Sequence, residues 1–141
     1  MNAMTGEAAD YSAGVWEHFR APRNAGVFPA GMAGILAGRA GSARHGREVE
    51  WMLRLDGAGR ITACRYRVYG CPATIALCSR TSEMVRGMSP GEAAAYSVVG
   101  LAEELGLPAE KRAAALVVED ALRAALTGYN SKQSPPSAAM G

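Results

Sequence analysis

Alternating hydrophobic and polar residues mark a strand in the middle of the chain. Residues 49–55 have the period-two pattern of a half-buried strand, in which every second residue is hydrophobic: Val49, Trp51, Leu53 and Leu55. Residues 56–59, with an aspartate and two glycines, predict a hairpin turn. Residues 60–69 form the return strand, with Cys64, Tyr66 and Val68 on one face and Arg65 and Arg67 on the other. This hairpin predicts an antiparallel sheet with one covered face and one arginine-rich, solvated face.

Helical spacing of hydrophobic residues occurs on both sides of this hairpin. Residues 11–19 predict a short amphipathic helix that ends before Pro22. The glycine-rich residues 31–41 predict either a weak edge strand or an irregular arm. From Cys71 onward the pattern is helical, and the predicted segments are residues 71–87, 93–105 and 107–128. Ser89 and Glu92 form a capping box in front of the second of these segments.

The order of these elements predicts one α+β domain. We expect a small three-stranded antiparallel sheet covered on one face by helices, within residues 11–130. Residues 1–10 lack periodicity and predict a disordered N-terminus. Residues 131–141, with paired prolines and small residues, predict a flexible tail.

Composition and charge exclude several classes of protein. The formal net charge is only +2, but arginines gather in one stretch: Arg39, Arg44, Arg47, Arg54, Arg60, Arg65 and Arg67. This stretch is explained by a solvated sheet face or by a docking surface for an acidic partner, and no nucleic-acid-binding motif accompanies it. The sequence shows neither a secretory signal nor an apolar run long enough to span a membrane. We therefore expect a cytoplasmic protein whose three cysteines are thiols or metal ligands.

Cys71 stands where a strand should end and a helix should begin. Gly70 precedes it, and Pro72 suits the first turn of a helix because that position needs no backbone N–H. A helix N-terminus stabilises a thiolate through unpaired N–H groups and the positive end of the helix dipole. The position thus indicates a reactive thiol, and the alternative is a small residue tolerated at a corner.

The other cysteines and the histidines indicate less. Cys64 lies mid-strand and is expected in the core, as is Cys78, which lies two helical turns after Cys71 and remains a reserve candidate for the site. His45 lies in a glycine-flanked loop and is a candidate metal ligand, although most loop histidines are surface residues. His18 is expected to have a structural role beside aromatic residues.

The chain resembles the U-type iron–sulfur cluster assembly scaffold family, that is, the IscU-like or NifU N-terminal domain. The resemblance extends from Tyr11 to about residue 132 and is carried by these segments: 18–19, 22–26, 69–71, 83–87, 102–108 and 119–122. It implies a non-enzymatic scaffold that assembles a [2Fe–2S] cluster, or binds zinc when isolated. It also implies a cysteine desulfurase as sulfur donor and a chaperone that helps to release the cluster.

The family's ligands transfer unevenly to this chain. The resemblance places the family's first cysteine at His45, its aspartate at Arg47, and its second cysteine at Cys71. The histidine–cysteine pair falls on Ala113–Ala114, which cannot bind metal. The chaperone-recognition segment falls on residues 107–111 and is only partly kept, with three candidate partner-binding residues: Leu107, Pro108 and Lys111. That partial match weakens the expectation of a chaperone interaction.

One thiolate and one imidazole cannot complete a tetrahedral iron or zinc shell within one chain. Two subunits of a homodimer could share a cluster, a partner or small thiol could complete it, or Cys71 could only accept sulfur. We therefore expect an iron–sulfur cluster assembly protein in which Cys71 is the sulfur acceptor or iron ligand. His45 is then the next ligand and Arg47 an electrostatic modifier. The alternatives are a non-metal paralogue that regulates the desulfurase machinery and a zinc-binding structural module.

Overall fold

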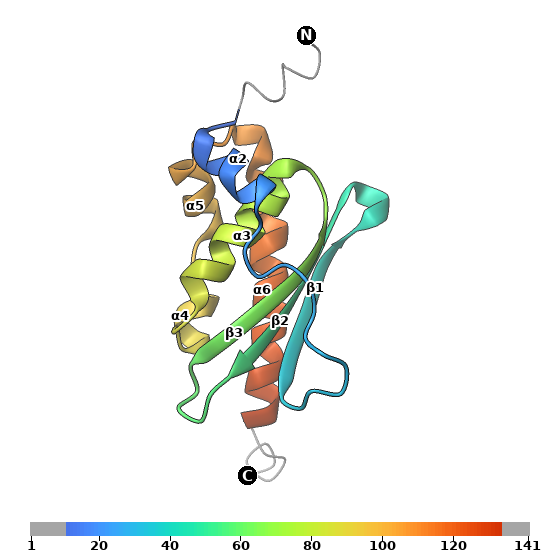
Figure 1. The fold of residues 1–141 in the computed structure, drawn as a ribbon, viewed down its shortest axis with the longest axis vertical. Coiled ribbons are helices and arrows are strands. Elements are labelled where there is room, and N and C mark those ends of the chain that lie inside the picture. The colour runs from blue at the N-terminus through green and yellow to red at the C-terminus, as the bar shows by residue number, and fades with distance from the viewer. Residues whose placement is uncertain (1–10, 134–141) are drawn as a thin grey trace.

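Three strands and a layer of helices form the part of the chain that the computed structural model describes, residues 11–133. The elements are α2 (Ala13–Arg20), β1 (Ile35–Ser42), β2 (Arg47–Leu55), β3 (Ile61–Tyr69), α3 (Pro72–Val85), α4 (Pro90–Ala94), α5 (Val98–Glu104) and α6 (Arg112–Gln133), with the 3₁₀ turns η1 (Ala43–His45) and η2 (Ala109–Lys111). The strands form one antiparallel sheet in the order β1-β2-β3. Helices cover one of its faces (Figure 1). The predicted α+β architecture is confirmed.

The predicted chain ends correspond only partly to the structure. The N-terminal segment 1–10 lies outside the described residues, as do residues 134–141 of the predicted tail. The last helix was expected to stop at Gly128, but α6 continues to Gln133, three residues into that tail. The reason is that Gly128 lies in ordinary helical geometry, whereas the glycines that end α3 and α5, Gly87 and Gly106, have positive φ.

The strand register places two turns at the same end of the sheet. Ser42 pairs with Arg47 across the β1–β2 turn, and Glu48 pairs with Tyr69, the last residue of β3. The β1–β2 turn and the β3–α3 connection therefore both lie at the upper end of the sheet in Figure 1, and the β2–β3 turn lies at the lower end. Cys71 and the turn that carries His45 therefore lie at the same end of the sheet.

The core lies between the sheet and α3–α6. Its largest fully buried side chains include Trp51, Leu53, Tyr66, Leu77 and Leu122. The Trp51 Nε1–H group donates to the carbonyl oxygen of Val118 at 3.2 Å, which satisfies the only polar atom of that indole. Burial of this sheet face is as the period-two pattern predicts.

A buried carboxylate joins α5 to α6. Glu119 is 6% exposed, and its Oε2 accepts the backbone N–H groups of Val98 and Val99 at 2.7 and 3.1 Å. These are two of the N–H groups that the start of α5 would otherwise leave unpaired. Arg123 lies 3.2 Å from the other carboxylate oxygen, so Glu119 is also paired in charge.

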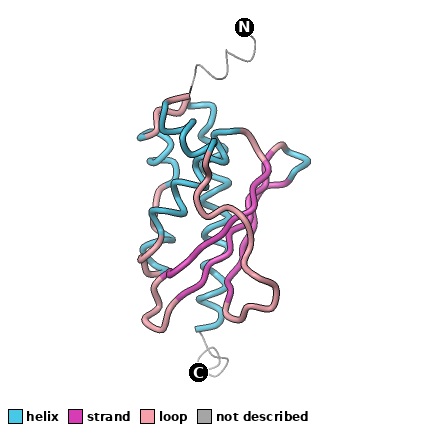
Figure 2. Tube along the Cα trace, in the orientation of Figure 1, coloured by secondary structure: helices cyan, strands magenta, loops and turns pink. Residues whose placement is uncertain are grey.

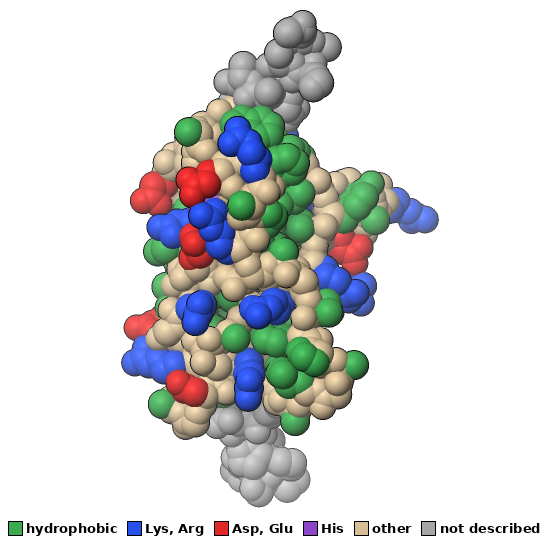
Figure 3. All heavy atoms as spheres, viewed as in Figure 1, with side chains coloured by type: hydrophobic (Ala, Val, Ile, Leu, Met, Phe, Trp, Pro, Cys, Tyr) green, Lys and Arg blue, Asp and Glu red, His purple; other side chains and the backbone are tan. Residues whose placement is uncertain are grey.

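The outer face of the sheet is less exposed than the sequence predicts. Two of its arginines pair with acidic neighbours, Arg39 with Glu48 at 3.1 Å and Arg67 with Glu50, and on the face shown in Figure 3 most acidic side chains lie beside basic ones. Met52, on this face, is only 8% exposed. The segment between α2 and β1 pairs with β3 at Ala25 and crosses this face to reach β1 (Figure 2). The expectation of a wholly solvated face was therefore wrong, because a long irregular connection gives no periodic signal.

Candidate functional site

Cys71 occupies the corner between β3 and α3. It is the N-cap residue of α3, with φ −80° and ψ 170°, and Pro72 follows at the start of the helix, as the sequence predicts. Its side chain does not cap the helix and is partly exposed. At Gly70 a Cβ atom would lie 3.0 Å from the Thr74 side chain, so a larger residue would crowd the first turn of α3. The corner thus presents Sγ beside the helix N-terminus.

Hydrogen-bond donors surround the sulfur. Thr74 Oγ1 lies 3.4 Å from Cys71 Sγ, and the Lys111 Nζ group donates to Sγ at 3.7 Å. Partial burial opposes ionisation of the thiol. It is outweighed by the Thr74 side chain, by the N–H groups of Thr74 and Ala73, which lie near the sulfur without capping the helix, and by the charge of Lys111. The pKa of Cys71 therefore lies below the ordinary value for a thiol, which favours a nucleophilic thiolate.

Lys111 lies in the site, although the sequence predicted a different role for it. It belongs to η2, between α5 and α6, and was predicted only as part of a partner-binding segment. It is 40 residues from Cys71 along the chain, so no local spacing indicates the contact. Of the other two residues assigned to that segment, Leu107 is half-buried and packs against the core, and Pro108 is the N-cap residue of η2.

His45 lies on the adjacent turn, but it is not bonded to Cys71. It is exposed in η1, and its Nδ1 is 2.7 Å from the Ser42 hydroxyl, which lies in the same turn. No hydrogen bond or ion pair joins His45 to Cys71 in the described part of the chain. Arg47 is half-buried, and its Nε atom is buried without a hydrogen-bond partner among residues 11–133.

The two remaining cysteines lie away from the corner. Cys64 and Cys78 are both fully buried, and Cys64 Sγ donates to the Ser82 carbonyl oxygen at 3.4 Å. Burial raises the pKa of Cys64 to about 11 and raises that of Cys78 further. Cys78 lies two turns, roughly 10 Å, along α3 from Cys71. It belongs to the core and does not reach the thiol.

The described residues do not form a metal-binding cluster. Within residues 11–133, no group of three or more His, Cys, Asp or Glu side chains is arranged to hold an ion. The positions that the resemblance assigns to a histidine and a cysteine are Ala113, which is exposed, and Ala114, which is fully buried in the first turn of α6. The described residues of one chain therefore do not fit a complete iron or zinc shell.

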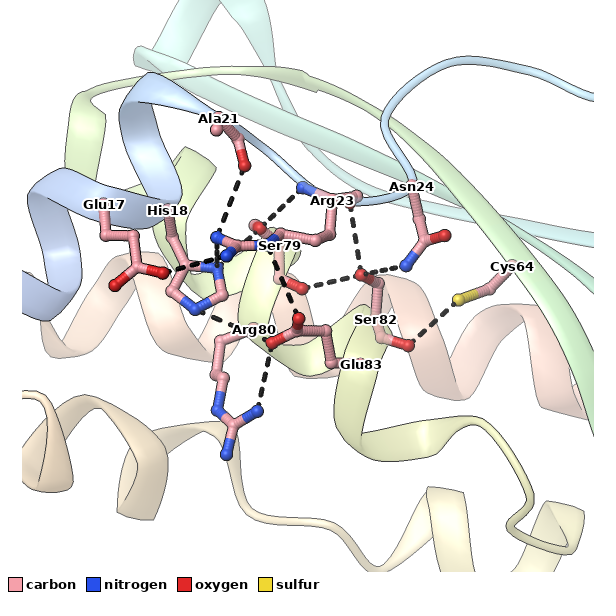
Figure 4. A network of polar contacts seen from close by, with 10 residues as sticks. All are labelled: Glu17, His18, Ala21, Arg23, Asn24, Cys64, Ser79, Arg80, Ser82 and Glu83. Carbon is pink, nitrogen blue, oxygen red and sulfur yellow. Dashed lines mark hydrogen bonds and ion pairs between the residues drawn. The ribbon is translucent and has the colours of Figure 1, made fainter.

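A polar network joins α2 to α3 (Figure 4). His18 Nδ1 lies 2.7 Å from Ser79 Oγ, and the same oxygen accepts the backbone N–H of Arg23 at 2.8 Å. Arg23 Nη1, which can only donate, lies 3.3 Å from His18 Nδ1, so Nδ1 is an acceptor and the Ser79 hydroxyl can donate its proton to it. His18 Nε2 faces Glu83 at 3.6 Å. The structural role predicted for His18 agrees with these contacts.

Burial and the neighbouring arginines favour the neutral form of His18. Burial lowers the pKa of His18, and so do Arg23 and, more weakly, Arg80, against the opposing effect of Glu83 and Glu17. The unfolded chain therefore takes up this proton first as the pH falls. The contribution of His18 to stability is fully present above its ordinary pKa of 6.5 and is lost as the pH falls through the lower folded value.

We expect the free energy of unfolding to fall between about pH 7.5 and about pH 5.5, measured by urea denaturation at each pH. His18→Asn cannot gain a proton, so it should be less stable than the wild type at the higher pH and lose less on acidification. An unchanged pH dependence in His18→Asn would show that other groups cause the acid effect.

The fold and the corner together define a class of protein. The class is an α+β domain whose helices cover one face of a small antiparallel sheet and which presents one activated thiol where β3 meets α3. Several solved structures share this fold, and two of them illustrate it. One is the N-terminal part of a nitrogen-fixing NifU-like protein from Brucella abortus, with a TM-score of 0.67 and 18% identity over 87% of this chain and 96% of that one. The other, from Fervidobacterium islandicum, is titled a putative iron–sulfur cluster assembly scaffold protein for the SUF system, with a TM-score of 0.62 and 14% identity over 86% and 99%.

Sequence similarity gives the family. Residues 10–135 match the family described as NifU-like N terminal domain. The iron–sulfur cluster assembly scaffold protein IscU of Escherichia coli K12 is 35% identical over 123 residues, covering 87% of this chain and 96% of the relative. Iron sulfur cluster assembly protein 2, mitochondrial, of Saccharomyces cerevisiae is 32% identical over 126 residues, covering 89% and 81%. This chain belongs to the NifU-like N-terminal domain family.

Within residues 11–133, no helix has the length and hydrophobicity to cross a membrane.

Proposed function

We propose that this protein takes part in iron–sulfur cluster assembly and that Cys71 is the thiol that accepts sulfur. The observation that carries the proposal is the surroundings of Sγ, where the Lys111 ammonium at 3.7 Å and Thr74 at 3.4 Å favour an anionic, nucleophilic sulfur. Family membership supports it, because relatives that align over most of the chain are named cluster assembly scaffold proteins. Sulfur acceptance requires a single reactive thiol, which one chain supplies.

A cluster would be cargo on this protein. Among the described residues, the Cys71 end of one chain offers a thiolate and, on the neighbouring turn, the imidazole of His45, whereas a tetrahedral shell needs more ligands. A cluster built here would therefore take further ligands from a second copy or from a partner protein. The partner we infer for sulfur supply is a cysteine desulfurase, which carries sulfur as a persulfide.

A second candidate function is regulation of that desulfurase without transfer of sulfur. The alanines at positions 113 and 114 favour it, because they remove two ligands that the family resemblance predicts. The two functions differ in whether the Cys71 thiol is required.

An anaerobic assembly assay tests the proposal. It contains a cysteine desulfurase, cysteine, ferrous iron and an apo-ferredoxin as acceptor, and the visible absorbance of the acceptor's cluster is followed. We expect this protein to accelerate cluster formation and Cys71→Ser to fail to do so. Equal effects of wild type and Cys71→Ser would favour regulation, and no effect of the wild type would contradict the proposed function.

A further inference from the structure

Three segments far apart in the sequence meet at the Lys111 ammonium group. Cys71 and Thr74 come from the start of α3, Lys111 comes from η2, and Tyr11 precedes α2. Lys111 Nζ lies 3.7 Å from Sγ and 5.9 Å from the centre of the Tyr11 ring. The ammonium group therefore lies between a sulfur and an aromatic face, both of which attract a cation.

The packing of η2 fixes the position from which Lys111 reaches the sulfur. Leu107, just before η2, packs against the main core and also against a second, small hydrophobic cluster. That small cluster, which Cys71 also contacts, consists of Tyr11, Val15, Ala73 and Ala76. The Lys111 backbone N–H donates to the Pro108 carbonyl oxygen at 2.9 Å, which closes the 3₁₀ turn. Lys111 thus extends from a backbone anchored in the same cluster as its target, which reduces the entropy lost when the contact forms.

The chemistry of the ammonium group suits a sulfur that carries negative charge. A lysine side chain has three donors and no acceptor, so it stabilises an anionic sulfur and gives nothing to a neutral thiol beyond a weak contact. A thiolate and a persulfide both place negative charge at this position. The Thr74 hydroxyl, 3.4 Å from Sγ, can donate to the same sulfur.

We propose that Lys111 is a positioning residue that holds the anionic sulfur of Cys71 before and after it accepts a sulfur atom. This inference rests on the proposed function of Cys71, and it gives Lys111 a role inside the site in addition to any role in partner recognition. In the step itself, the Cys71 thiolate attacks the outer sulfur of a donor persulfide. The donor S–S bond breaks, a new S–S bond forms at Sγ, and the donor leaves as a thiolate, so no external oxidant or reductant is consumed.

Sulfur uptake from inorganic polysulfide tests this role without a partner protein. The Cys71 thiolate takes one sulfur from the polysulfide ion, which leaves shortened by one atom, and the mass gain of the whole chain is followed with time at fixed pH. We expect Lys111→Met to take up sulfur about 10-fold more slowly than the wild type, since a charge within a few ångströms shifts a thiolate equilibrium by that order. Lys111→Arg, which restores the charge, should return the rate to within about 3-fold of the wild type.

Arg112→Met is the matched control, because it removes the neighbouring positive charge, which is exposed and, within residues 11–133, forms no hydrogen bond with Sγ. We expect it to change the rate by less than about 2-fold. If Lys111→Met does not fold by circular dichroism, Lys111→Gln takes its place. The role of Lys111 would be overturned if Lys111→Met took up sulfur as fast as the wild type, or if Arg112→Met slowed uptake as much as Lys111→Met does. Neither result would contradict the proposed function of Cys71. A wild-type chain that takes up no sulfur from polysulfide or from a desulfurase would instead contradict the proposed function.

Discussion

Cys71→Ser is expected to remove almost all of the fast thiol reactivity of the native protein. Of the three thiols, only Cys71 is accessible, because Cys64 and Cys78 are each 0% exposed. Only Cys71 has a pKa below the ordinary thiol value, whereas burial raises the pKa of the other two. The buried thiols can react only when the structure opens, which a stable domain does rarely.

Alkylation by iodoacetamide, counted by mass spectrometry, measures this difference. We expect one rapid label per native wild-type chain and three in urea, and we expect Cys71→Ser to react at least about 100-fold more slowly than the wild type in its native state. Cys78→Ala is the control and should keep the rapid label. A second label that appears as fast as the first in the native wild type would contradict the description of Cys64 and Cys78 as core residues.

Gly38→Ala is expected to produce the largest loss of stability. Gly38 lies in β1 directly beneath α6, and an added Cβ would overlap the backbone nitrogen of Ala125 and lie 2.7 Å from its Cα. Backbone atoms cannot yield as a flexible side chain can, so α6 would have to move away from the sheet. That movement would separate core residues such as Leu122 and Leu126 from their neighbours.

We expect Gly38→Ala to lower the free energy of unfolding by at least about 3 kcal/mol, measured by urea denaturation. Gly57→Ala is the matched control, since a Cβ at Gly57 meets no heavy atom within 4 Å. The control should lie within about 0.5 kcal/mol of the wild type. Equal unfolding midpoints for the two variants would show that α6 does not rest on the backbone of β1 as described.

The sequence predicts elements whose signal is local. The alternation through residues 49–55 predicts β2, and the structure also has the predicted capping box, in which Ser89 and Glu92 exchange hydrogen bonds at 3.2 and 2.9 Å. Cys71 at the start of α3 is confirmed for the same reason, because a glycine, a cysteine and a proline at a strand end determine the corner between them.

Features that depend on distant segments could not be predicted. Nothing in the order of residues indicates that Lys111 reaches a sulfur 40 positions away, since that contact depends on how η2 packs against α2 and α3. The cover over Met52 likewise comes from an irregular segment that shows no pattern. The roles assigned to His45 and Arg47 stay predictions, because they came from alignment with the family. Both roles concern a bound ligand or partner.

Mass spectrometry of the digested protein shows whether Cys71 receives sulfur for cluster assembly. The protein is incubated anaerobically with a cysteine desulfurase and cysteine, then blocked, digested and mapped. We predict that the peptide containing Cys71 gains one sulfur atom and that the peptides containing Cys64 and Cys78 gain none. No added sulfur on Cys71, while the desulfurase carries its own persulfide in the same sample, would contradict the claim.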